Sequence, residues 1–132
     1  MIDDESLIRS FEAGEEPAGG FHHAEHVRVA WWYLRQHPWP EALARFGAAL
    51  RRFAAAQGKP NLFHETITTA FVLVINQRLD DADRHAPWTD FVAQNPDLLT
   101  WRPSVLDRYY RPDTLQSERA RRSFVLPDRL AD

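Results

Sequence analysis

Residues 38–60 read PWPEALARFGAALRRFAAAQGKP, and this stretch decides the fold class because it predicts one long amphipathic helix. Pro40 suits the first helical turn, where its missing N–H costs no hydrogen bond, and Gly58 suits the C-terminal stop. Large apolar residues recur at the spacing of a single helix face: Leu43, Phe46, Leu50 and Phe53. Such a stripe must be buried against neighbouring elements.

The segments on both sides of this stretch also have helical periodicity. Residues 22–37 predict a helix that Pro38 stops. Residues 62–86 predict another helix, which Asn61 caps. The acidic pair at positions 3 and 4 can cap a first short helix, whose apolar stripe contains Leu7, Ile8 and Phe11.

The C-terminal third breaks into shorter pieces because prolines interrupt it. Residues 87–95 and 103–110 are expected to form brief helices, and Asp113 with Gln116 resembles a capping box that opens a further helix. No segment alternates at period two for more than a few residues. We therefore predict an all-α fold in one domain over residues 1–132: a bundle of three to four main helices with short C-terminal helices packed across it.

Composition and charge exclude several classes of protein and several kinds of site. The chain has 132 residues and a formal net charge of −3. It therefore lacks the excess of positive charge that is typical of proteins that bind nucleic acid or anionic membranes. It has no cysteine, which excludes disulfides, thiolate metal ligands and cysteine nucleophiles. The acidic N-terminus does not look like a signal peptide, and the longest apolar run, residues 71–75, is too short to span a bilayer. We expect a cytoplasmic protein.

Half of the six histidines lie in residues 21–26, FHHAEH. An α-helix advances about 100° per residue, so spacing tells which side chains share a face. His23 lies on the apolar stripe of its helix, and His26 lies about 60° to one side. We expect this i, i+3 pair to converge near the core, whereas His22 lies toward the edge of the stripe. Phe21 can staple the start of the helix.

A histidine of another helix also faces the core. His64 continues the stripe that contains Phe71 and Ile75, the most apolar face of the chain, and Thr68 lies directly above it. A purely hydrophobic core needs neither His64 nor Thr68 on this helix face. We expect His64 and the histidine pair to meet at one end of the bundle.

These positions predict a metal centre. Three neutral imidazoles bind Zn, Cu, Fe or Ni, so His23, His26 and His64 are the candidate ligands of a divalent transition metal. Glu25 and Glu65 are the candidate catalytic residues, each as a further ligand, as an acceptor that fixes an imidazole tautomer, or as a general base.

The same residues allow a second interpretation, in which the histidines, Glu65 and the threonines form a buried hydrogen-bond network that fixes helix register. An H-x-x-H pair alone is a weak signal, and the H-E-x-x-H pattern of zinc proteases is absent. The sequence therefore leaves three classes open: a metal-dependent enzyme acting on a small molecule, a non-catalytic metal- or ligand-binding module, and a helical scaffold.

Two other features have alternative interpretations. The five tryptophans either line a pocket for a flat small molecule or pack the core and helix junctions. The segment Ser117 to Arg122, SERARR, either recognises an anion or forms a solvated basic face. Neither feature predicts an oligomeric state.

Three stretches together resemble a bacterial family of short all-α proteins with no established activity: FHHAEHVRVAWWYL (21–34), EALARFGAALRRFAAAQGKPNLFHETIT (41–68) and ARRSFVLPD (120–128). The family pattern is F-x-H-x-x-H-V near the start, H-E-T-x-T in the middle and A-R-x-x-F-x-x-P-D at the end. The residues that match its first two blocks are Phe21, His23, His26, His64, Glu65, Thr66 and Thr68. His22 occupies a variable position, and Phe63 stands where the family tends to have tyrosine. The resemblance implies no particular reaction.

Overall fold

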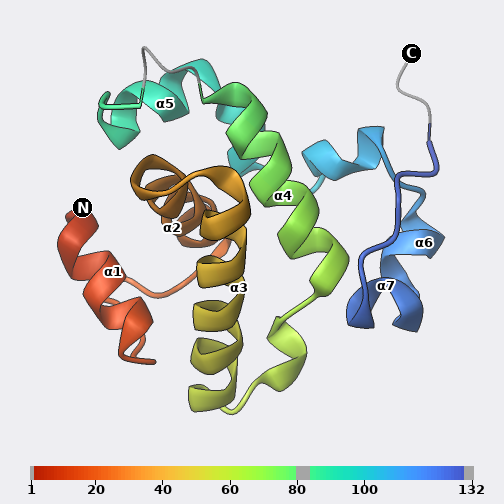
Figure 1. Cartoon of the computed structure of the whole chain (residues 1–132), viewed down its shortest axis with the longest axis horizontal. Coiled ribbons are helices and arrows are strands. Elements are labelled where there is room, and N and C mark those ends of the chain that lie inside the picture. The colour runs from red at the N-terminus through yellow and green to blue at the C-terminus, as the bar shows by residue number, and fades with distance from the viewer. Residues whose placement is uncertain (1, 80–83, 130–132) are drawn as a thin grey trace. The chain divides into compact units, whose positions relative to one another are not determined.

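The computed structural model describes residues 2–79 and 84–129, and Figure 1 shows the chain. The regular elements of the described residues are helices, so the predicted all-α class is confirmed. Contacts gather into two compact units, Met1–Phe63 and His64–Asp132, and each is described by itself. The single domain over residues 1–132 stays a prediction.

The first unit contains three α-helices and a short 3-10 turn: α1 (Asp4–Glu12), α2 (His23–Gln36), α3 (Trp39–Ala56) and η1 (Pro60–Leu62). α3 lies against both α1 and α2 (Figure 1). As the sequence predicts, α3 has Pro40 in its first turn, and Gly58 follows it with a positive φ of 70°. A glycine in this conformation is the common way to end a helix. Residues 38–60 thus supply the central helix of this unit.

Aromatic rings fill the space between these three helices. Phe11 of α1 stacks on Phe46 of α3, with ring centroids 6.0 Å apart, and lies 5.4 Å from Phe53. Phe21, in the loop before α2, also stacks on Phe11, with ring centroids 5.3 Å apart. Because aromatic rings bury large areas, this cluster accounts for much of the packing of the unit.

Two polar contacts join α1 to α2. Arg28 is buried. Its Nε and Nη2 donate to Asp4 Oδ1, at 2.9 and 2.6 Å respectively. Its Nη1 donates to the carbonyl of Ile2 at 2.8 Å. The Tyr33 hydroxyl donates to Glu12 Oε2 at 2.6 Å. Burial, with the Glu12 carboxylate beside it, raises the pKa of the Tyr33 phenol. These contacts fix how α1 lies along α2.

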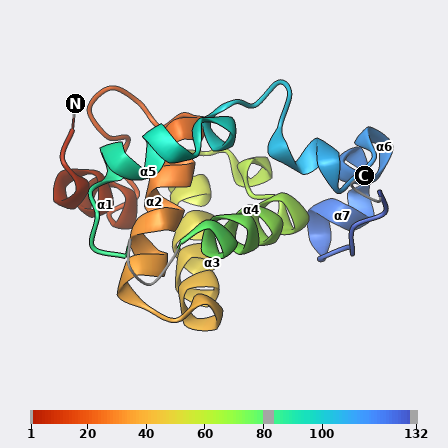
Figure 2. The same cartoon turned by 90° about the horizontal axis from the view of Figure 1, so that it is seen from above.

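The second unit is built from one main helix and several short ones: α4 (Glu65–Arg78), α5 (Trp88–Gln94), η3 (Pro96–Leu99), η4 (Val105–Arg108), α6 (Pro112–Gln116) and α7 (Glu118–Arg122). α4 packs against α7 and η4, and α6 packs against α7 (Figure 2). The buried side chains of this unit include Val72, Ile75, Leu98, Leu106 and Tyr110.

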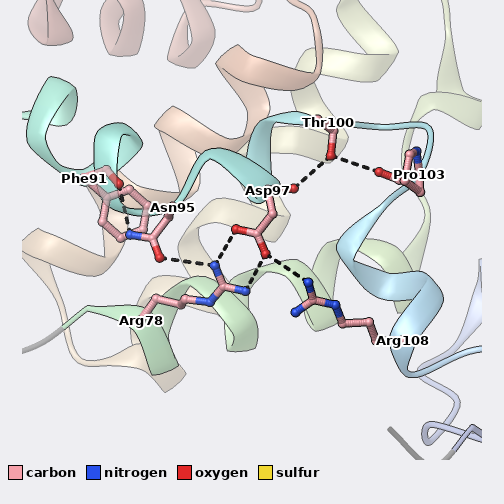
Figure 3. A network of polar contacts seen from close by, with 7 residues as sticks. All are labelled: Arg78, Phe91, Asn95, Asp97, Thr100, Pro103 and Arg108. Atoms are coloured by element: carbon pink, nitrogen blue, oxygen red, sulfur yellow. Dashed lines mark hydrogen bonds and ion pairs between the residues drawn. The ribbon is translucent and has the colours of Figure 1, made fainter. Parts of the chain in front are cut away.

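An ionic cluster joins the end of α4 to the 3-10 turns (Figure 3). Arg78 donates to both oxygens of Asp97, at 2.7 and 2.8 Å, and to Asn95 Oδ1 at 3.2 Å. Arg108 of η4 lies 3.7 Å from the same carboxylate. The hydrogen bond from Arg78 holds the pKa of Asp97 below its ordinary value. A fork-to-fork arginine–carboxylate contact constrains orientation as well as distance, so it fixes η3 against α4.

The predicted boundaries of the fourth helix are partly wrong. Asn61 does not cap it, because Asn61 lies in η1, and the helix begins at Glu65 with His64 as its N-cap. An imidazole nitrogen serves as the capping acceptor in place of the asparagine oxygen. The helix ends at Arg78; residues 80–83 of the predicted span lie outside the described residues.

The capping box predicted at Asp113 and Gln116 is also corrected. α6 begins at Pro112, after Arg111, and the chain turns extended at Ser117 instead of continuing as one helix. The Ser117 hydroxyl accepts from the N–H of Ala120 at 3.1 Å and so starts α7. Serine is a preferred N-cap because its oxygen replaces the acceptor that an upstream carbonyl would supply.

Candidate functional site

The histidines of residues 21–26 surround the start of α2. His22 is the N-cap, and His23 and His26 are the first and fourth helical residues. Gly20 precedes them with φ 94°, and a Cβ there would lie 2.5 Å from the His22 ring. Only glycine therefore fits this turn without displacing the ring.

His26 is held by ring packing. Its ring centroid lies 4.4 Å from that of Phe21, which in turn lies 4.5 Å from Phe53. Phe21 directly precedes the N-cap and His26 is the fourth helical residue, so the predicted hydrophobic staple is confirmed. Among the described residues, no hydrogen bond to the His26 ring is found.

The environment of His26 keeps its imidazole neutral. Burial, with a further contribution from neighbouring His23, lowers the pKa of His26 from 6.5 to about 4. A neutral imidazole has one nitrogen with a free lone pair, which is the form that binds metals and accepts protons. His23 and His26 lie one turn apart on α2, and their convergence on one point stays a prediction.

The low pKa of His26 predicts acid-sensitive stability. Unfolding returns the pKa to about 6.5, so the unfolded chain takes up a proton that the folded protein excludes, and stability falls as the pH falls from 6.5 toward 4. Between about pH 7 and about pH 5 we expect a loss of up to about 2 kcal/mol from this group. Urea unfolding with EDTA present measures it, and His26→Phe should flatten the profile. An unchanged profile in that variant would refute the assignment.

Glu25 is engaged at the start of the helix. Its Oε1 accepts from the backbone N–H of His22 at 2.6 Å and lies 3.2 Å from the His22 ring Nδ1. This is the contact that the third helical residue makes in a capping box. Its part in catalysis stays a prediction; the observed contact explains why a glutamate is useful at this position.

His64 has hydrogen bonds at both ring nitrogens. Nδ1 accepts from the N–H of Ile67 at 3.1 Å, so Nε2 carries the proton in a neutral ring and donates to the carbonyl of Leu115 at 2.7 Å. In this arrangement the imidazole has no lone pair left for a metal ion. Glu65 is the first residue of α4 and is partly buried.

Thr66 was one of the threonines of the alternative hydrogen-bond network, but sequence reasoning identified none of its partners. Its side chain is fully buried, and its hydroxyl donates to the carbonyl of Ser123 at 2.8 Å while accepting from the N–H of Val125 at 3.1 Å. The second middle-block threonine, Thr68, is also buried. The sequence shows Thr66 as a polar residue beside the apolar stripe of its helix. No local sequence pattern predicts that its hydrogen-bond partners lie 57 and 59 positions later.

The structure therefore divides the predicted site residues between the two units. His23, Glu25 and His26 belong to the first, whereas His64 and Glu65 belong to the second. Within residues 2–79 and 84–129, no group of three or more His, Cys, Asp or Glu side chains is arranged to hold a metal ion. The histidine pair alone supplies two imidazoles.

Comparisons with known proteins give no further guide to the site. No protein-family model, curated protein or solved structure matches the chain. Among the described helices, none combines the length and the apolar character needed to cross a membrane.

Proposed function

We propose that this chain is a transition-metal-binding helical protein and that His23 and His26 of α2 supply its imidazole ligands. The observation that supports this most directly is the state of His26, which is neutral near pH 7 and packs against Phe21 without a hydrogen bond among the described residues. Water or a bound small molecule would complete the coordination, as in metal centres that keep a position open for a substrate.

The proposal gives His64 a different role from that of the histidine pair. Its nitrogens already bond Ile67 and Leu115, and releasing them would leave the start of α4 without its cap. A third imidazole from His64 therefore requires that at least the cap bond from Ile67 be broken first. His64→Asn separates the alternatives, because asparagine caps a helix as well as any residue but carries no imidazole.

Calorimetric titration of tag-free protein with Cu²⁺, Ni²⁺ and Zn²⁺ tests metal binding. We expect Cu²⁺ to bind most tightly, since imidazole sites follow the Irving–Williams order. His26→Phe should abolish binding while keeping the ring contact with Phe21. His22→Gln is the matched control, because the His22 side chain is 76% exposed and lies at the edge of the site.

Two results would contradict this assignment. If none of the three metals binds, or if His26→Phe binds as tightly as the parent protein, the pair is not the metal site. The proposal expects His64→Asn to bind normally, and a large loss of affinity in that variant would restore His64 as a ligand.

A second candidate function, a helical scaffold, is favoured by the network around α4. His64 and Thr66 together contact three backbone positions of the C-terminal segments, so these polar residues have structural partners without any metal. In this interpretation the H-E-T-x-T residues hold the second unit together and present its surface to a partner.

His64→Ala tests the structural role in metal-free protein. We expect the free energy of unfolding to fall by about 2 kcal/mol, from the lost N-cap and the lost bond to Leu115. Chemical denaturation with EDTA present measures it. His64→Asn should recover about half of the loss, because it restores the cap alone. Equal stability of His64→Ala and the parent would exclude a structural role for this ring.

A further inference from the structure

We draw no further inference here: the strongest candidate, the exposed apolar stretch around Phe124 and Leu126 in the C-terminal segment of the second unit, carries none because nothing in the structure of the described residues shows what covers it.

Discussion

Replacing Thr66 with valine is expected to lower the free energy of unfolding by about 2–4 kcal/mol, the largest effect of a single substitution that we anticipate. Valine has nearly the shape of threonine, so packing is kept while the hydroxyl is lost. The carbonyl of Ser123 and the N–H of Val125 then lose their partner. A polar group left without a hydrogen bond costs more than the bond itself contributes.

Chemical denaturation measures the loss, and limited trypsin digestion locates it. Release of the C-terminal segment should speed cleavage after Arg122, which is exposed in the parent protein but belongs to α7. Thr66→Ser is the matched control, because it keeps the hydroxyl and removes only a methyl group. If serine and valine destabilise equally, packing and not hydrogen bonding would explain the effect.

Replacing Asp4 with alanine is expected to cost about 3 kcal/mol, because it leaves a buried guanidinium without its carboxylate. The Arg28 side chain is 9% exposed and the Asp4 side chain 32%, so water can replace only part of the lost contact. The bond from Arg28 to Ile2 would remain, but it carries no negative charge. α1 should therefore separate from α2 more readily.

Urea denaturation of three proteins measures this effect. Glu5→Ala is the matched control, since Glu5 is the exposed acidic neighbour of Asp4 on the same helix. Asp4→Asn keeps the shape of the side chain and should fall between the parent and Asp4→Ala. Equal stability of Asp4→Ala and Glu5→Ala would show that the Arg28 contact contributes nothing.

Local patterns predicted the helices of the first unit well. Proline and glycine mark both ends of α3, and the apolar spacing identifies its buried face, as Phe46, Leu50 and Phe53 confirm. The contact of Phe21 with His26 was also predictable, because a staple depends only on positions relative to the N-cap. These features need no information about distant residues.

The hydrogen bonds of the second unit could not be predicted in this way. Helices are usually capped by Ser, Thr, Asp or Asn and not by histidine. Asn61 was therefore the stronger candidate for the N-cap of α4. The partner of His64 Nε2 is a backbone carbonyl 51 positions later, and a carbonyl carries no side-chain signal. The sequence shows that His64 and Thr66 are polar, but their hydrogen-bond partners depend on the tertiary structure.

The separation of Thr66 from Val125 has a consequence for synthesis on the ribosome. The two residues are 59 positions apart, so at about 5–20 residues per second the partner is made about 3–12 s later. The first unit ends at Phe63, and its helices can assemble while the rest of the chain is still being made. α4 must wait through that interval with a polar hydroxyl on a face destined for burial. The nascent second unit is therefore the part most exposed to chaperones and to premature association.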